Sequence, residues 1–380
     1  MPETQKCQFK SKIIEDYTCP EPALKNSEKG YCIFHEPSED KNIKNFSEGI
    51  KRKIDKKDYD FRGYWFPEEE THLEEPAFEW RITFTNFTFE TLALFAESIF
   101  KGYAYFSGAT FEKGADFRDS TLEKRAVFPS STFKERVYFG FIFDFGSTFK
   151  DMAIFNGAAF EKGADFARTT FEGVADFTGA TFRDAVFTAA TFEKAADFRN
   201  SSFVYADFAA STFKEIVRLD HVRFKIPSHA DVLFRKAKVL WHEQGNYVEE
   251  GKCHYQEMDY IRKQKNWFVR YILANLFHRL LYGYGEKPFW IFAWCAGLII
   301  FSSVIYWISK GVLKIVGVRA VPVEDYWNSL YFSVVTFTTL GYGDFRPIGK
   351  VKILASIEAI LGIFFVALFI FTFARRTAGR

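Results

Sequence analysis

The sequence predicts a membrane protein of several domains, in which a right-handed quadrilateral β-helix is followed by helices and then by an all-α domain with two membrane spans. Phenylalanine is unusually abundant, with 48 copies in 380 residues, and it is regularly spaced through the middle of the chain. Two uncharged or nearly uncharged runs near the end are each long enough to cross a bilayer. The net charge of +2 gives no reason to expect nucleic acid as a partner.

The phenylalanine ladder predicts the β-helix. From Phe78 the aromatic residues alternate steps of six and five, lose the pattern around Phe143, resume at Phe149 and later shorten to mostly five-residue steps. Neither an α-helix nor a simple strand alternation repeats in this way, whereas a solenoid does. Runs such as Ala164-Asp165-Phe166 resemble the pentapeptide-repeat family. That resemblance implies a four-sided β-helix over residues 78–225, with coils of about 22 residues and about 4.8 Å each.

The buried side of each coil should hold these aromatic rings. Each stacked ring contributes about 1.5 to 3 kcal/mol, so the ladder can account for the folding of this segment. We expect the rings to be core rather than part of a ligand site.

Residues 1–50 contain three of the five cysteines and a histidine that could bind one metal ion: Cys7, Cys19, Cys32 and His35. The chain start does not resemble a secretory signal, so a disulfide framework is not expected. The Cys32-x-x-His35 spacing favours zinc, although the gaps from Cys7 to Cys19 and to Cys32 match no familiar zinc finger. The alternative is a set of free cytosolic thiols. Residues 51–77 read as a charged linker.

Residues 226–287 are rich in Lys, Glu, Gln and Leu, which predicts cytosolic helices. Within them, Trp267 to Tyr282 alternates apolar and charged residues over a length too short to span a bilayer. We expect an amphipathic helix at the cytosolic membrane surface there.

A pore domain is predicted over residues 288–376. Its spans are 289–309 and 352–374, and basic residues precede the first and follow the second. The connecting loop is also basic, so the distribution of charge alone does not fix the orientation of the spans. The expected absence of a secretory signal is the stronger reason to place the N-terminus in the cytoplasm. Together these features predict a multi-pass protein of the cell membrane with both termini in the cytoplasm.

The segment between the spans carries the most specific motif in the chain. An expected helix over 326–338 is followed by Thr339-Leu340-Gly341-Tyr342-Gly343-Asp344, residues 339–344. This arrangement resembles the pore helix and selectivity filter of a potassium channel. The resemblance implies a tetrameric pore in which K⁺ replaces its water with main-chain carbonyls. The coordinating carbonyls would belong to Thr339, Leu340, Gly341, Tyr342 and Gly343.

Other residues are expected to support the filter or to gate it. The filter supports are Asp344, Tyr331, Phe332 and Thr338. A second Gly-Tyr-Gly, at residues 283–285, lacks the threonines and the aspartate, and we assign it no ion role.

In the second span, Gly362 is either a hinge or a packing glycine, and Val366 and Ile370 are candidates for an inner gate. The intramembrane acid Glu358 is expected to contact a hydroxyl or main-chain group of the pore helix, with structural support favoured over ion binding.

Two other functions are compatible with the same sequence features. A slightly wider filter would give a weakly selective cation channel, and a non-conducting pore would leave an interaction scaffold anchored in the membrane. A cytosolic protein or ligand could bind the β-helix, whose balanced charge disfavours nucleic acid. No grouping of nucleophile and base suggests an enzyme.

Overall fold

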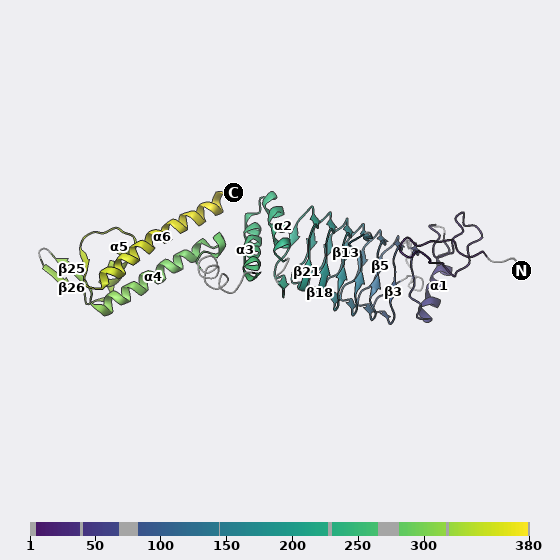
Figure 1. The fold of residues 1–380 in the computed structure, drawn as a ribbon, viewed down its shortest axis with the longest axis horizontal. Coiled ribbons are helices and arrows are strands. Elements are labelled where there is room, and N and C mark those ends of the chain that lie inside the picture. Colours follow the sequence, from purple (N-terminus) through teal and green to yellow (C-terminus); the bar gives the residue numbers. More distant parts are fainter. Residues whose placement is uncertain are drawn as a thin grey trace, which may run out of the picture. The chain divides into compact units, whose positions relative to one another are not determined.

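The computed structural model describes residues 5–38, 41–67, 83–143, 145–226, 230–264, 281–316 and 319–378. It contains two compact units, residues 1–246 and 247–380, which we describe separately. Figure 1 shows the solenoid of the first unit and the helices of the second. The predicted amphipathic helix at Trp267 to Tyr282 falls almost wholly outside the described residues.

The first unit is a β-solenoid, as the phenylalanine spacing predicts. The strands of one sheet are, in spatial order, β1 (Trp65–Phe66), β4 (Ile99–Phe100), β8 (Thr121–Leu122), β12 (Thr148–Phe149), β16 (Thr170–Phe171), β19 (Thr191–Phe192) and β22 (Thr212–Phe213). The strands of a second sheet are, in spatial order, β5 (Ala104–Tyr105), β9 (Ala126–Val127), β13 (Ala153–Ile154), β17 (Ala175–Asp176), β20 (Ala196–Asp197) and β23 (Val217–Arg218).

The largest sheet of the solenoid has eleven strands and joins two of its sides. Its strands are β2 (Thr88–Phe89), β3 (Ala93–Leu94), β6 (Thr110–Phe111), β7 (Ala115–Asp116), β10 (Thr132–Phe133), β11 (Val137–Tyr138), β14 (Ala159–Phe160), β15 (Ala164–Asp165), β18 (Thr181–Val186), β21 (Ser202–Asp207) and β24 (Arg223–Phe224). Every strand pairing of the solenoid is parallel, because each coil repeats the path of the one before it.

Aromatic rings stack from coil to coil through the centre of the solenoid. Phe106 and Phe128, for example, are parallel with ring centroids 4.7 Å apart. Both are fully buried, which confirms the ladder as core. The stack also includes Phe61 and Phe66, which pack on Phe95 and Phe100 upstream of the expected start at residue 78. Their five-residue spacing was the signal that could have located this first coil.

The coil length changes where the sequence pattern breaks. Thr88 pairs with Thr110, 22 residues later, whereas Thr132 pairs with Ala159, 27 residues later. The extra residues lie between Phe139 and Ser147, which are joined by a main-chain hydrogen bond of 2.8 Å. The inserted Phe143 is 75% exposed, so the insertion leaves the core.

Helices close both ends of the described solenoid. Near its start, α1 (Ile43–Asp55) is capped by the Asn42 side chain and buries Phe46, whose ring meets Phe66 edge-on at 5.6 Å. Near its end, α2 (Ala230–Glu243) buries Phe234 against Phe224, with ring centroids 6.1 Å apart. These helices cover apolar coil ends that would otherwise be exposed.

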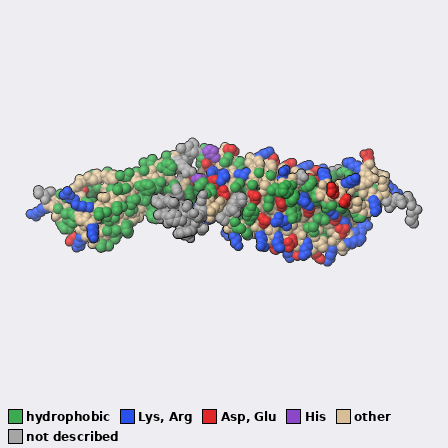
Figure 2. Space-filling model, viewed as in Figure 1, with side chains coloured by type: hydrophobic (Ala, Val, Ile, Leu, Met, Phe, Trp, Pro, Cys, Tyr) green, Lys and Arg blue, Asp and Glu red, His purple; other side chains and the backbone are tan. Residues whose placement is uncertain are grey.

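The second unit is helical, with a small outer sheet. It contains α3 (Tyr247–Gln264), the short 3₁₀ helix η3 (Gly283–Gly285), α4 (Pro288–Ser309), α5 (Tyr326–Phe337) and α6 (Val351–Ala378). Residues Phe289–Ser309 and Val351–Ala374 are long and apolar enough to cross a membrane, which agrees with the expected spans. In Figure 2 hydrophobic side chains cover α4 and α6, whereas charged side chains are scattered over the solenoid.

The outer sheet was not predicted from the sequence. Strand β25 (Val312–Val316) lies between β26 (Arg319–Pro322) and β27 (Phe345–Pro347), and both pairings are antiparallel. The sheet therefore joins the loop after α4 to the segment between the filter motif and α6.

Candidate ion pathway and metal site

The filter motif has an alternating backbone. Thr339, Gly341 and Gly343 have φ values of 55°, 56° and 81°, in the left-handed region. Leu340 and Tyr342 lie between them and do not have positive φ. Glycine takes this conformation without strain, which explains its use at two of the three positions. Left-handed residues therefore alternate with residues of negative φ along this motif.

Helix α5 leads directly into this motif. It begins at the N-cap Asp325, whose side chain accepts a hydrogen bond of 2.8 Å from the Asn328 main-chain N–H. At its other end Thr338 donates its hydroxyl to the Val334 carbonyl at 2.7 Å. The chain then turns, with the Leu340 N–H donating to the Val335 carbonyl at 3.1 Å. The C-terminal end of α5 thus fixes the start of the filter motif.

The Leu340 and Tyr342 side chains of the filter motif point away from the core of this chain. Leu340 and Tyr342 are 59% and 67% exposed within the single chain. Of the two expected packing partners, Tyr331 packs against Phe345, with ring centroids 5.3 Å apart. Phe332 also packs against Phe345, at 6.3 Å, and lies in the buried cluster between α4 and α6, where its ring meets Tyr306 at 5.0 Å.

The outer sheet holds the far end of the filter motif. The Ile315 N–H of β25 donates to the Asp344 carbonyl at 2.8 Å. Lys314 of the same strand pairs with Phe345, the residue that follows. Because these bonds involve the main chain, the sheet fixes the path of the chain as it leaves the filter motif.

Glu358 joins α6 to the two helices beside it. The residue is 1% exposed, and its carboxylate accepts hydrogen bonds from the Tyr306 hydroxyl of α4, at 2.6 Å, and from the Ser333 hydroxyl of α5. Its partners are thus hydroxyl groups on both neighbouring helices. Buried and hydrogen-bonded in this way, the side chain is suited to structural support.

Gly362 lies one helical turn further along α6 and also faces α5. A Cβ at this position would be 2.1 Å from the Phe337 carbonyl oxygen and 3.0 Å from its carbonyl carbon. Between the hinge and the packing interpretations, this close approach favours packing.

Beyond Gly362, part of α6 has side chains that are exposed in the single chain. Val366 and Ile370, the candidates for the inner gate, are both exposed. Neighbouring Phe365 is buried in a cluster with Ile291 and Phe337, and Phe369 packs against Phe292 at 4.7 Å. The two aliphatic side chains therefore lie on the face of α6 that is free to line a pathway.

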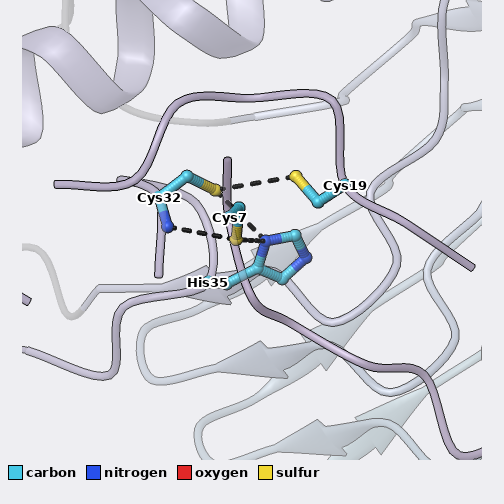
Figure 3. A group of neighbouring side chains, drawn as sticks. All are labelled: Cys7, Cys19, Cys32 and His35. Carbon is cyan, nitrogen blue, oxygen red and sulfur yellow. Dashed lines mark hydrogen bonds between the residues drawn. The ribbon is translucent and has the colours of Figure 1, made fainter. Parts of the chain in front are cut away.

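The four predicted metal ligands come together in the first unit. The ligand atoms of Cys7, Cys19, Cys32 and His35 all lie within 4.8 Å of one another, and all four residues are buried. Figure 3 shows the side chains pointing towards a common centre. His35 Nδ1 lies 3.2 Å from Cys32 Sγ and 3.5 Å from Cys7 Sγ, and Cys19 Sγ lies 3.8 Å from Cys32 Sγ.

The close sulfur atoms disturb each other's protonation. Hydrogen bonds with Cys19 and Cys32 lower the pKa of the Cys7 thiol, whereas hydrogen bonds with Cys32 and Cys7 raise the pKa of Cys19. Burial alone would lower the pKa of His35, but its contacts with Cys32 and Cys7 raise that pKa to about 9. These are strongly interacting groups rather than independent thiols.

Comparison with known protein families identifies both units. Residues 293–378 match the family described as ion channel, and residues 73–121 and 177–223 match pentapeptide repeats. The chain therefore contains an ion-channel domain of the two-span, potassium-channel type. It carries this domain after a pentapeptide-repeat solenoid. Comparisons with curated proteins and with solved structures give no match.

Proposed function

We propose that the protein is a potassium-selective channel in which four copies of residues 339–344 form the filter. The pore conducts K⁺ passively and performs no enzymatic reaction. The channel resides in the cell membrane with both termini in the cytoplasm, and the solenoid is a modulatory or interaction module. K⁺ is then the permeant ion rather than a resident cofactor.

The alternating backbone of the filter motif carries this proposal. When left-handed residues alternate with residues of negative φ, successive carbonyl groups turn towards the same side of the strand. Thr339, Gly341 and Gly343 supply that alternation. A dehydrated monovalent cation is stabilised by such a row of carbonyl oxygens. With α5 fixing its start and β25 fixing its end, the row is held without support from the Leu340 and Tyr342 side chains.

The homotetramer follows from the number of oxygens an ion needs. One strand offers only one or two carbonyls at a given depth, so four strands around an axis are required to replace a hydration shell. The exposed Leu340 and Tyr342 side chains support this assembly. In the tetramer they would pack against the pore helices around the filter.

The decisive experiment measures ion selectivity in liposomes that contain the purified full-length protein. We expect reversal potentials close to the K⁺ equilibrium value in mixed K⁺ and Na⁺. The variant Gly343→Ala should lose K⁺ flux, because alanine disfavours the left-handed conformation. Gly349→Ala is the matched control, since Gly349 has φ of 54°, has similarly open space and lies outside the filter.

Each alternative predicts a different outcome in this assay. A weakly selective cation channel would give reversal potentials between the K⁺ and Na⁺ values. A membrane-anchored scaffold would give no flux from wild-type protein. Normal K⁺ flux through Gly343→Ala, or a monomeric protein in the bilayer, would contradict the proposed filter.

Modulation by the solenoid is tested separately. Single-channel recordings should show a changed open probability after deletion of residues 1–225. An unchanged open probability would remove the modulatory role and leave the filter proposal intact.

A further inference from the structure

The segment before the solenoid is ordered without regular secondary structure. Within residues 5–38 the structure shows turns, bends and one isolated bridge, from Lys6 to Pro22, but neither a helix nor a strand of two residues. A segment of this kind buries little apolar surface and does not fold without another source of stability. Disulfides and metal ions are the usual sources in chains this short.

The cluster at its centre has the composition of a closed metal site. Three sulfur atoms and one imidazole nitrogen, from Cys7, Cys19, Cys32 and His35, form a complete set of four ligands. Thiolate and imidazole ligands bind zinc strongly, whereas Mg²⁺ and Ca²⁺ prefer oxygen. With four protein ligands no position is left for a reacting molecule, which is typical of structural rather than catalytic zinc.

The groups around the cluster orient its ligands. His35 Nε2 lies 2.9 Å from the Arg62 carbonyl oxygen, so this nitrogen carries the proton and Nδ1 is free to bind a metal. The Cys32 N–H donates to Cys7 Sγ at 3.2 Å, a bond that stabilises a thiolate. The Phe9 ring stacks on His35 at 4.0 Å and covers its face. Both the imidazole and one sulfur are therefore held in a binding orientation.

The cluster is attached to the first coil of the solenoid. Phe34, next to His35, stacks on Tyr64 at 4.6 Å, and its carbonyl accepts a hydrogen bond of 2.8 Å from the Trp65 N–H of β1. The Lys12 N–H donates to Glu97 at 2.7 Å, which ties the loop between the first two cysteines to the next coil. The ligands thus join separate loops to the end of the aromatic stack.

We propose that Cys7, Cys19, Cys32 and His35 bind a structural zinc ion that fixes the N-terminal cap on the first coil of the solenoid. The ion adds to the few aromatic contacts that hold this segment, such as that between Phe34 and Tyr64. Ends of solenoids require such caps, because the last coil otherwise exposes its stacked core to water. This proposal is independent of ion conduction, since its ligands all lie in the first unit.

Elemental analysis of the full-length protein, purified without metal-affinity steps, tests the proposal directly. We expect about one zinc per chain in wild-type protein. Cys32→Ser should lose it, whereas Cys295→Ala, which removes a cysteine of α4 far along the chain, should retain it. Wild-type protein with no bound metal, or with a disulfide among Cys7, Cys19 and Cys32, would overturn the proposal.

Two measurements on wild-type protein keep the proposal testable if Cys32→Ser fails to fold. Replacement of zinc by Co²⁺ should produce the visible absorption and thiolate charge-transfer bands of a tetrahedral sulfur-rich site. Removal of the metal with a chelator should make trypsin cleave faster after Lys10, Lys12, Lys25 and Lys29. The far-UV circular dichroism signal of the solenoid should not change. Cobalt spectra without thiolate bands, or cleavage that chelation leaves unchanged, would contradict a metal-held cap.

Discussion

Gly362 of α6 lies directly against the main chain of Phe337 at the end of α5, where an added Cβ would be 2.1 Å from the carbonyl oxygen. One turn earlier, Glu358 meets Ser333. The two contacts are four residues apart on both helices, so they form a continuous seam. Movement of α6 along this seam would displace Phe337, two residues before the filter motif.

We therefore predict that Gly362→Ala impairs the channel. Because the nearest atoms belong to the main chain, the helices must separate to admit a methyl group, and K⁺ flux in liposomes should fall by about tenfold or more. Gly297→Ala in α4 is the matched control, since no neighbouring atom lies within 4 Å of the position that its methyl group would take. Equal K⁺ flux from the two variants would show that the close contact between Gly362 and Phe337 does not affect conduction.

Replacement of Glu358 should destabilise the membrane domain. In Glu358→Ala the buried Tyr306 hydroxyl loses its acceptor, at a cost of about 1 to 3 kcal/mol, whereas the Ser333 hydroxyl keeps the Ile299 carbonyl as an acceptor at 2.9 Å. Thermal unfolding in detergent should show a lower midpoint. Glu358→Gln retains an acceptor and should be closer to wild type, and Ser356→Ala on the exposed side serves as control. A Glu358→Ala midpoint equal to that of wild type would argue against the support role.

The aromatic stack should dominate the stability of the solenoid. Phe155→Ala removes a fully buried ring that stacks on Phe128 and Phe177, and should cost about 3 to 5 kcal/mol. Phe143→Ala removes an exposed ring of the insertion and should be almost neutral. Limited proteolysis of the full-length protein during heating can compare them. Similar cleavage temperatures for both variants would contradict the stack as the main source of stability.

Two aspartates of the solenoid should affect stability in opposite directions. Burial raises the pKa of Asp197, but hydrogen bonds from Arg199 outweigh burial and hold that pKa below its usual value. Burial also raises the pKa of Asp165, and there the main-chain bond from Ala167 does not compensate. Both aspartates occupy equivalent Ala-Asp-Phe positions, so the arginine two residues later makes the difference.

The pH dependence follows from these directions. Asp197 stabilises the fold above the unfolded-state pKa near 3.8, and this contribution is lost as the pH falls through its lower folded pKa. Asp165 favours the fold at low pH and loses that contribution as the pH rises from 3.8 through its raised pKa. At pH 7 we thus expect Asp197→Asn to lower and Asp165→Asn to raise the unfolding temperature. Shifts of the same sign would refute this assignment.

Local patterns in the sequence were sufficient to predict the main elements. Ring spacing predicted the solenoid, and two apolar runs predicted α4 and α6, because each signal is repeated over many residues. The outer sheet was missed, since Val312–Val316 and Arg319–Pro322 are too short to show a period. The packing of Gly362 was also undecidable, because a small residue is compatible with bending and with close contact alike.

The metal ligands show a different limit. Cys7 and Cys19 are separated by a gap without a familiar spacing, so only Cys32 and His35 formed a local motif. The four ligands come together because long-range contacts hold their loops in place. One such contact is the hydrogen bond of 3.0 Å from the Cys7 N–H to the Glu21 carbonyl. Long-range loop contacts of this kind leave no periodic trace in a sequence.

The insertion between Phe139 and Ser147 shows that this architecture accommodates extra residues. Extra residues leave the ladder and the next strand rejoins it in register, so a coil can gain a surface loop without disturbing its neighbours. Whole coils can be added or deleted for the same reason, each altering the separation of the two capped ends by about 4.8 Å. The solenoid is thus a spacer whose length is adjustable in fixed increments, while its surface can acquire new loops independently.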